Sequence, residues 1–504
     1  MSMPAEHVNQ AMTLAELMQG YADAPDIPVY GIASDSRQLQ EGDLFLACQG
    51  IGSHGIDYVA DAVAAGVVAI AYDASTSSRP SGEFGIPMLA VDDLGRHLGS
   101  IANRFFHSPS AAVRVIGITG TNGKTTVAWL IAQCLERLGE TCGYMGTLGS
   151  GIGEVDLGEG MTTPATVEMH HRLADFRDAG ARFAAIEVSS HALDQNRVDG
   201  VAFDTVLFTN LSRDHLDYHG DMQSYADAKA RLFTEYSAKQ RIINLDAEFG
   251  AQLADRCGQD VVTVSTNFDR VANGRPYVFV RSVVANADGS QVRVSSSWGD
   301  SEFALPLPGD FNVANAVIVL ALLLNQGVPL ETACAVLEDV EAPPGRMQRV
   351  VTEVARPVVY VDYAHTPTAL DVVLRSLRTH CRGKLWCVFG CGGDRDQGKR
   401  PQMGKVAVRR ADRVVITSDN PRSETPGDII AAIAAGADRP DSVVLIEDRA
   451  TAIAWAIANA GDDDIVLIAG KGHENYQLLG AERRDFSDLG AAAANLALRA
   501  ESRQ

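Results

Sequence analysis

Residues 113–126 read VRVIGITGTNGKTT. The first seven are rich in β-branched and apolar side chains, which predicts a buried strand. Beyond the stretch, apolar residues recur every three or four positions, which predicts a helix with one buried face: Val127, Leu130, Ile131, Cys134, Leu135 and Leu138. A polar, glycine-rich turn therefore joins a strand to a helix, and we predict an α/β protein with a phosphate-binding loop.

The chemistry of that turn suits a nucleotide. Its glycines let the backbone wrap an oligophosphate, and the helix N-terminus offers unpaired N–H groups. Lys124 can reach the terminal phosphates, and the Thr125 hydroxyl can bind Mg²⁺. The predicted ATP-binding residues here are Gly120, Thr121, Asn122, Gly123, Lys124, Thr125 and Thr126.

The turn departs from the general phosphate-loop pattern, because Ile118 occupies the position of the first glycine. A glycine-rich turn without a ligand is the alternative interpretation. The chain lacks the Asn-Lys-x-Asp segment with which a GTPase reads guanine, so ATP is the expected nucleotide.

Outward from this turn, the pattern predicts three domains. Strands at 43–48 and 67–72, a helix at 57–65 and a Gly/Ser/His loop at 51–55 indicate a small α/β domain. Breaks near 106–110 and in the sequence APPGR at 342–346 set the boundaries. We predict an N-terminal domain (1–108), a central domain (109–343) and a C-terminal domain (344–504).

Further strands and helices fill the central and C-terminal domains. In the central domain we expect strands at 184–188 and 206–209, antiparallel strands within 261–301, and an apolar helix at 313–324. The C-terminal domain has apolar strands at 358–361, 385–389, 414–417 and 465–469. Helical patterns separate most of them, which favours a parallel, doubly wound sheet.

Composition narrows the class of protein. The formal charge of −21 over 504 residues disfavours binding to nucleic acid or to an anionic membrane. No apolar run is long enough to cross a bilayer, and the first residues do not resemble a secretory signal, so we expect a cytoplasmic enzyme. The eight cysteines are scattered, which predicts free thiols rather than disulfides or a metal site.

Two polar segments follow strands of the central domain. Glu187 ends the strand at 184–188, where an acid is the usual second magnesium anchor of a phosphate-loop enzyme. A plain polar strand end is the alternative. Residues 210–218, NLSRDHLDY, also follow a strand, and predict either a site or a hydrogen-bonded surface turn.

Taken in order, GTNGKTT, EVSSHALDQNRV, TNLSRDHLDYHG, DYAHTP and DNPR closely resemble the Mur ligase family over nearly the whole chain. The resemblance implies an N-terminal UDP-binding domain, a central ATPase domain and a C-terminal Rossmann-like domain. It also implies an ADP-forming ligase of peptidoglycan precursor synthesis. Such an enzyme adds meso-diaminopimelate to the D-glutamate of UDP-N-acetylmuramoyl-L-alanyl-D-glutamate through an acyl phosphate.

The resemblance also implies roles for single residues. Lys124, Lys229 and His215 would be catalytic, and Mg²⁺ would be held by Thr125, Glu187, His215 and Lys229, the last as a carbamate. By itself Lys229 is a helical lysine that would be expected in solvent. The UDP precursor would contact Ser36, Thr162, Thr163, Ser189, Gln195 and Arg197, and ATP would also contact Asn312, Arg346 and Asp362. The loop at 51–55 does not align with the family.

The loops that follow the C-terminal strands predict an amino-acid-binding site. Loops after the carboxyl ends of parallel strands share one edge of the sheet, here the loops DYAHT, CGGDRD, DNPR and GKGHE. Mixed charges suit a zwitterion, because arginine grips carboxylates and carboxylates receive ammonium groups. In the family, DNPR accompanies meso-diaminopimelate. The predicted set is Arg395, Asp419, Asn420, Pro421, Arg422, Gly470 and Glu474; isolated surface ion pairs are the alternative.

Two other functions remain open. A phosphate-loop ATPase acting as a switch or motor would hydrolyse ATP without an amino acid. A folylpolyglutamate synthetase is a close variant of the ligase, which the N-terminal α/β domain and DNPR disfavour. We expect a monomer whose partners are the UDP-N-acetylmuramoyl dipeptide, meso-diaminopimelate and ATP.

Overall fold

The computed structural model describes residues 12–50, 52–78, 80–156, 160–270, 274–286, 288–352, 356–480 and 482–501. The chain divides into two compact units. The first comprises Met1–Gly120, Gly139–Leu207 and Ser212–Arg241. The second comprises Thr121–Leu138, Phe208–Leu211 and Ile242–Gln504.

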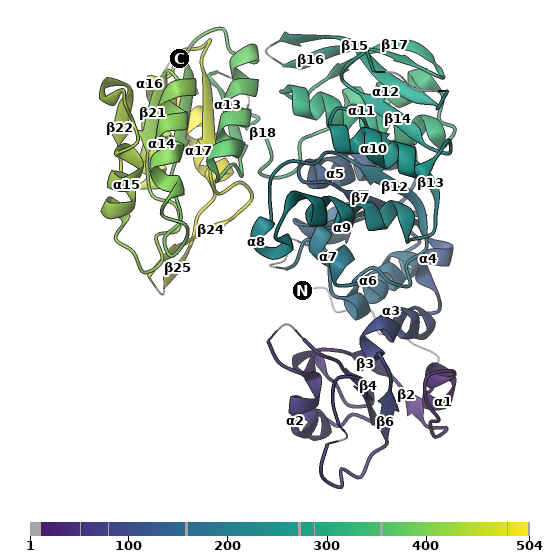
Figure 1. The fold of residues 1–504 in the computed structure, drawn as a ribbon. Helices are drawn as coiled ribbons and strands as arrows, with labels where there is room; N and C mark the ends of the chain where they lie inside the picture. The colour runs from purple at the N-terminus through teal and green to yellow at the C-terminus, as the bar shows by residue number, and fades with distance from the viewer. Residues whose placement is uncertain are drawn as a thin grey trace. The chain divides into compact units, whose positions relative to one another are not determined.

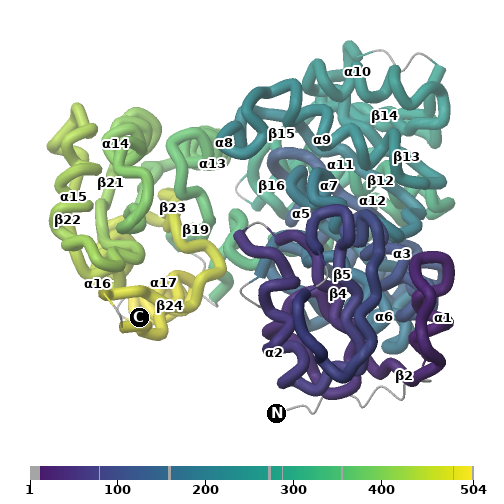
Figure 2. Tube along the Cα trace, turned by 60° about the horizontal axis from the view of Figure 1, so that its bottom comes forward, coloured from purple at the N-terminus to yellow at the C-terminus, as the bar shows by residue number. Residues whose placement is uncertain are grey.

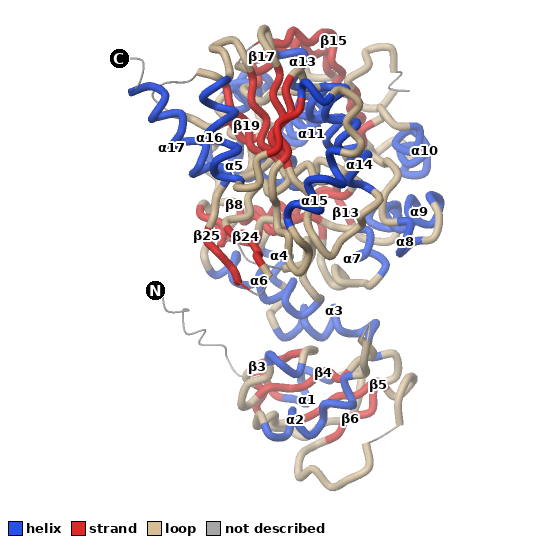
Figure 3. Tube along the Cα trace, turned by 90° about the vertical axis from the view of Figure 1, so that its left-hand side faces the viewer, coloured by secondary structure: helices blue, strands red, loops and turns tan. Residues whose placement is uncertain are grey.

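The first unit begins with a four-stranded parallel sheet, drawn in red in Figure 3. Its strands lie in the order β3 (Gly31–Ala33), β4 (Asp43–Ala47), β5 (Ala69–Asp73) and β6 (Met88–Val91). Alternate residues point to opposite faces. Leu44 and Leu46 join a core with α1 (Leu14–Met18) and α3 (Leu94–Phe105), whereas Phe45 and Ala47 pack with α2 (Val59–Ala64). A small ribbon, β1 (Met12–Thr13) with β2 (Pro28–Val29), precedes this sheet.

The rest of the first unit is built on β7 (Arg114–Thr119), the strand predicted at 113–119. It pairs in parallel with β11 (Phe183–Glu187), which pairs in parallel with β8 (Cys142–Gly146). A hairpin of β9 (Gly149–Ile152) and β10 (Glu154–Asp156) extends one side, and β12 (Phe203–Phe208) neighbours β7. The helices are α4 (Pro109–Ala112), α6 (Thr166–Asp178), α7 (Ser190–Asp194), α8 (Leu216–His219) and α9 (Met222–Thr234).

The second unit contains the helix after the glycine-rich turn, α5 (Lys124–Arg137), and a run of strands that begins with the last residues of β13 (Ala238–Asn244), from Ile242 onward. β14 (Val262–Ser265), β15 (Tyr277–Asn286), β16 (Gly289–Ser296) and β17 (Gly299–Leu305) follow β13 in spatial order. Two apolar helices, α11 (Asp310–Asn325) and α12 (Leu330–Glu338), complete this part. α11 is the helix predicted at 313–324.

The prediction of antiparallel strands within 261–301 is correct for β15, β16 and β17 and wrong for β14. β14 runs parallel to both β13 and β15. The cause is α10 (Glu248–Cys257), which carries the chain from β13 back to the start of the next strand. A crossover helix of this kind produces parallel neighbours.

The C-terminal sheet is parallel and doubly wound, as predicted. Its strands lie in the order β18 (Gln348–Arg349), β19 (Val358–Asp362), β23 (Ile465–Ala469), β20 (Leu385–Phe389), β21 (Arg413–Ile416) and β22 (Val443–Leu445). Only β18 is antiparallel to its neighbour among these strands. The sequence patterns missed β18 and β22 because both are short and only partly buried.

Helices cover both faces of this sheet (Figure 1). One apolar core joins it to α13 (Pro367–His380), α14 (Lys399–Arg410) and α15 (Pro426–Ala434), and another joins it to α16 (Arg449–Asn459) and α17 (Asp488–Glu501). The last two helices lie side by side (Figure 2). Because both faces are covered, polar loops can lie only at the strand ends.

The helix predicted at 57–65 begins later, at Val59, because a 3₁₀ turn (Gly55–Tyr58) precedes it. The ring of His54 accepts a hydrogen bond from Ile56 N, and Asp57 accepts one from His54 N, which closes that turn. All eight cysteines are free, as predicted. Within the described ranges, no helix is long and apolar enough to cross a membrane.

A glycine on α14 tests the C-terminal packing. A Cβ on Gly404 would lie 2.1 Å from the carbonyl oxygen of Ile433 on α15. Gly404→Ala should therefore lower the free energy of unfolding by about 1–3 kcal/mol through overpacking. Gly427→Ala on α15 is the control, because the nearest atom lies 4.0 Å from its Cβ. It should raise or preserve stability, within about 1 kcal/mol. Equal urea midpoints for the two variants would refute this packing.

Candidate active site

Hydrogen bonds from the residues that follow β12 hold the glycine-rich turn. Thr121 N donates to the Asn210 carbonyl (2.8 Å), and Asn122 N donates to Asn210 Oδ1 (3.0 Å). Asn210 Nδ2 and the Thr209 hydroxyl both donate to the Asn122 carbonyl, at 3.0 and 2.6 Å. Asn210, the first residue of the polar segment 210–218, thus fixes the backbone that would face phosphate.

Two features shape the start of α5. Gly123 has a φ of 87° and directly precedes the helix, a conformation that favours glycine. A Cβ there would lie 2.5 Å from Asn315 Oδ1 on α11. Lys124 Nζ donates to the Thr121 carbonyl (3.0 Å), so its ammonium lies at the turn. The arrangement provides helix N-terminal N–H groups and a cation, which together suit an anion.

Two glycines with similar backbone angles test this turn. Gly139, just beyond α5, has a φ of 81° but open space around its Cβ. Alanine at either position should cost about 1 kcal/mol of backbone strain, and only Gly123→Ala also strikes Asn315. We expect Gly123→Ala to raise the KM for ATP about tenfold or more, and Gly139→Ala to leave it unchanged. An equal KM for the two variants in steady-state assays would contradict an ATP-binding role for the turn.

In the first unit, Glu187 is a buried carboxylate at the end of β11. Its Oε1 accepts from the Tyr144 hydroxyl and from Thr147 N, both at 2.8 Å. Gly146 lets β8 approach, because a Cβ there would lie 2.1 Å from Glu187 Oε1. Glu187 therefore lies within a hydrogen-bond network at this strand end, and its role in binding Mg²⁺ stays a prediction.

The residues predicted to bind the UDP precursor gather around the same strand end. Thr163 donates its hydroxyl to the Glu187 carbonyl (2.8 Å) and accepts from Ser189 N (3.0 Å). Arg197 donates to the Thr163 carbonyl (3.0 Å) and, through Nε, to Gln195 Oε1 (2.9 Å). Thr162 lies within hydrogen-bonding distance of Thr147, 3.2 Å between hydroxyl oxygens. Burial lowers the pKa of Arg197. The structure thus brings five of the six predicted residues together.

His215 belongs to a cluster of rings on α7, α8 and α9. It has a φ of 52°, precedes α8, and its ring centroid lies 4.8 Å from that of His191. His191 also contacts Tyr218 and His219, with centroids 4.2 and 5.5 Å away. Burial, together with the neighbouring His215, His219 and Arg197, lowers the pKa of His191. Burial also lowers the pKa of His219, so His191 and His219 both favour the neutral imidazole.

Lys229 is almost fully buried, so the expectation of a solvated side chain is wrong. Its Nζ donates to the Gly120 carbonyl (2.9 Å) and lies 4.4 Å from the centroid of the Tyr225 ring. Helix α9 therefore presents this amine to the first residue of the phosphate turn. The carbamate that the resemblance implies for Lys229 stays a prediction.

The implied Mg²⁺ agrees with the donor chemistry. Within the described residues, no three His, Cys, Asp or Glu side chains form a ready metal cluster. Magnesium usually binds through one or two carboxylates together with substrate phosphates and water. Glu187, a buried carboxylate at a strand end of the first unit, is a donor of that kind.

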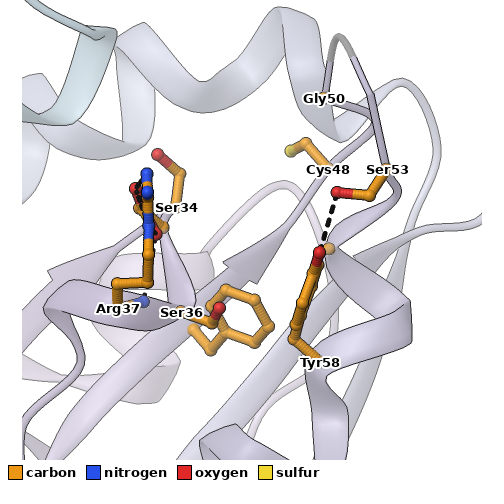
Figure 4. A pocket seen from close by; sticks show the side chains of 10 residues that line it. Ser34, Ser36, Arg37, Cys48, Gly50, Ser53 and Tyr58 are labelled. Atoms are coloured by element: carbon orange, nitrogen blue, oxygen red, sulfur yellow. Dashed lines mark hydrogen bonds and ion pairs between the residues drawn. The ribbon is translucent and has the colours of Figure 1, made fainter. Parts of the chain in front are cut away.

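A cavity of about 430 Å³ lies in the N-terminal sheet region, between the ends of β3 and β4. Figure 4 shows Ser34, Ser36 and Arg37 on one side and Cys48, Ser53 and Tyr58 on the other. The Tyr58 hydroxyl donates to Ser53 Oγ (3.1 Å), and burial raises the pKa of Cys48 to about 12. Ser36 lines this cavity, apart from the other predicted precursor residues.

Residues in and beside the loop that does not align with the family line this cavity. Gly50, Ser53 and Gly55 line it, whereas residue 51 lies outside the described residues. In the sequence, the polar composition of this loop was the feature that could have indicated a cavity. The sequence did not show that the loop folds back over β4.

The C-terminal loops meet at one sheet edge, as predicted. A Cβ on Gly470 would lie 2.7 Å from Asp419 Oδ2, so the third and fourth loops touch. A Cβ on Gly392 would lie 2.9 Å from Arg422 Nη1 and 3.7 Å from Arg395 Cγ. Both predicted arginines therefore flank one glycine of the second loop. These close approaches favour a shared pocket over isolated surface ion pairs.

The predicted DNPR segment is rigidly held. Asn420 Nδ2 donates to Glu474 Oε2 (2.9 Å), and Arg422 Nη1 donates to the Gly393 carbonyl (2.9 Å). The hairpin of β24 (Tyr476–Leu479) and β25 (Glu482–Asp485) pairs with the backbone of Arg422 through Leu478 and Gly480. Such a network fixes the directions in which the side chains point.

The three remaining ATP predictions fall in two places. Asp362 is buried and accepts from Met347 N (2.7 Å) and Ala364 N (2.8 Å), and burial raises its pKa despite the nearby Arg346 cation. The Arg346 guanidinium lies 4.7 Å from the centroid of the Tyr363 ring, next to Asp362. Asn312 lies apart on α11, where its Nδ2 donates to the Pro308 carbonyl (2.8 Å).

Sequence comparison covers most of the chain. Residues 28–106 match the catalytic domain of the Mur ligase family, 118–323 match the Mur ligase middle domain, and 345–472 match the Mur ligase glutamate ligase domain. The chain belongs to the Mur ligase family. The predicted three-part α/β architecture is thereby confirmed.

Similar proteins carry a more specific name. A UDP-N-acetylmuramoyl-L-alanyl-D-glutamate–2,6-diaminopimelate ligase of Alkalilimnicola ehrlichii is 45% identical, over 95% of this chain and 97% of its own. The enzyme of that name from Pseudomonas syringae pv. tomato is 45% identical, over 92% of this chain and 94% of its own. A solved structure of a ligase with this name is 34% identical, with a TM-score of 0.72, over 97% and 99% of the two chains.

Proposed function

We propose that this chain is an ATP-dependent ligase that joins 2,6-diaminopimelate, in its meso form, to the D-glutamate of UDP-N-acetylmuramoyl-L-alanyl-D-glutamate. Relatives of that name are 45% identical over nearly the full chain. The observation that carries the proposal is the C-terminal sheet edge, where Arg395 and Arg422 flank Gly392 and Glu474 bonds Asn420. Two cations match the two carboxylates of diaminopimelate, and a carboxylate matches an ammonium group of the same molecule.

The reaction proceeds in two balanced steps. A carboxylate oxygen of the D-glutamyl side chain attacks the γ-phosphorus of ATP, and the bond to the bridging oxygen breaks to release ADP. The uncharged amine then attacks the acyl carbon, and the tetrahedral intermediate expels inorganic phosphate. The amine proton leaves to solvent, and no protein nucleophile is required.

Residues of the chain position and neutralise the reactants. The turn at 120–123 binds phosphate through backbone N–H groups, and Lys124 lies against the transferring phosphoryl group. Thr125, Glu187, His215 and a carbamate on Lys229 would hold Mg²⁺, which would offset the negative charge of the phosphates. Arg346 stacks on Tyr363 beside Asp362, and its buried Nε lacks a hydrogen-bond partner among the described residues, which suits contact with a polar part of ATP.

The UDP precursor contacts two separate groups of residues. Its uridine enters the cavity lined by Ser36, Ser53 and Tyr58, whose volume of about 430 Å³ suits a nucleoside. Its peptide end contacts Thr162, Thr163, Ser189, Gln195 and Arg197. We place the enzyme in the cytoplasm, where ATP is supplied, and propose that it acts as a monomer with domains bounded at about 108 and 343.

Phosphate release tests this function. The wild-type enzyme should release phosphate only with the UDP-linked dipeptide and an amino acid together, and much faster with meso-diaminopimelate than with L-lysine. A second carboxylate held by two charge-assisted hydrogen bonds accounts for a preference of about a hundredfold or more. Release without an amino acid would support a switch or motor ATPase instead. Equal rates with the two amino acids would refute the role of DNPR.

Arg422 carries most of the expected selectivity. Arg422→Ala should raise the KM for meso-diaminopimelate about tenfold to a hundredfold, because a charged hydrogen-bond donor is lost. The KM for ATP should stay within about twofold, since the nucleotide residues are elsewhere. Arg375→Ala, at an exposed position on α13, is the matched control for losing one arginine of this domain. An unchanged KM for the amino acid in Arg422→Ala would contradict the assignment.

A further inference from the structure

A fully buried lysine lies directly behind the proposed amino-acid site. Lys471 has 0% of its side chain exposed, although it belongs to the polar loop GKGHE. Lysine is almost never fully buried unless its charge is paired. Its Nζ donates to Glu474 Oε2 (3.0 Å) and to Asn420 Oδ1 (3.1 Å). Both partners belong to the set assigned to the incoming amino acid.

The loop backbone directs this lysine inward. Gly470 and Gly472, on either side of it, have φ values of 115° and 56°. A Cβ on Gly472 would lie 2.8 Å from the Tyr363 Cβ, so the loop packs closely on the neighbouring one. The aromatic ring of Tyr476 closes the site, with its centroid 5.5 Å from Nζ. The position of Lys471 is therefore fixed by the fold and not by a choice of surface rotamers.

The lysine determines the orientation of the Asn420 amide. Oδ1 of Asn420 faces two donors, Lys471 Nζ and Leu478 N (3.0 Å). The amide nitrogen must then point the other way, and it donates to Glu474 Oε2 (2.9 Å). A flipped amide would set its NH₂ group against an ammonium and an N–H, which lack any acceptor. Only one orientation satisfies all the groups.

The two oxygens of the Glu474 carboxylate differ in their contacts. Oε2 accepts from both Lys471 and Asn420, whereas Oε1 makes no hydrogen bond with the residues that the structure describes. The Glu474 side chain is 21% exposed, so the carboxylate reaches from the buried pair to the surface of the loop. With one oxygen fixed, the other is held in a single direction.

We propose that Lys471 is a positioning residue for the amino-acid substrate: its buried ammonium fixes Glu474 Oε2 and the Asn420 amide, so that Glu474 Oε1 is presented to the substrate ammonium. This inference rests on the proposed function, because it takes the DNPR and GKGHE loops as the amino-acid site. Lys471 itself does not touch the substrate. Its effect passes to Glu474, both directly and through the Asn420 amide, which also donates to Glu474 Oε2.

The test compares Lys471→Met and Lys471→Gln in the full-length enzyme, with phosphate release as the assay. Losing the charge-assisted bond should raise the KM for meso-diaminopimelate about tenfold to a hundredfold in both variants, with the KM for ATP within about twofold of wild type. Lys405→Met, an exposed lysine on α14, is the control and should behave as wild type. Thermal midpoints identify any variant that fails to fold, and Lys471→Gln keeps a hydrogen-bond donor in case Lys471→Met is unstable.

A double-mutant cycle with Glu474→Gln separates positioning from a structural role. If Lys471 acts through Glu474, adding Lys471→Gln to Glu474→Gln should change the KM for the amino acid by less than about threefold. Full additivity of the two KM effects, or a loss of thermal stability with an unchanged KM, would overturn the inference. Wild-type enzyme that ignores meso-diaminopimelate would instead overturn the proposed function, so the two failures are distinct.

Discussion

A parallel sheet covered by helices on both faces has only the ends of its strands available for polar chemistry. The C-terminal sheet obeys this constraint, with apolar cores on each side and DYAHT, CGGDRD, DNPR and GKGHE at one edge. The first unit repeats it, because Glu187 ends β11 and Gly120 follows the neighbouring parallel strand β7. The proposed chemistry depends on this placement, which brings residues distant in sequence to one edge.

At three places in the site, a glycine lets a polar side chain approach the backbone closely. Gly146 admits the Glu187 carboxylate, Gly123 admits the Asn315 amide, and Gly470 admits Asp419. At each position a Cβ would collide with a polar side chain that belongs to the network. These glycines are therefore needed for the packing of the polar side chains around the site.

The sequence predicted features that depend on local pattern. Strand β7, helix α5 and the C-terminal strand ends follow from apolar spacing, so the phosphate turn and the DNPR loop could be placed in advance. Features that depend on long-range packing could not. Lys229 is buried by a contact with Gly120, more than a hundred positions away, and the parallel direction of β14 depends on a crossover. The burial of Lys471 could not be predicted either, because a lysine in a polar loop resembles a solvated one.

The most direct test of carboxylate activation uses a dipeptide precursor whose D-glutamyl carboxylate carries heavy oxygen. Transfer of that carboxylate oxygen to the γ-phosphorus predicts that one labelled oxygen appears in the released phosphate, in step with product formation. Mass spectrometry of the phosphate measures it. Phosphate without label, alongside normal product formation, would contradict an acyl phosphate and the placement of ATP and precursor on which the account depends.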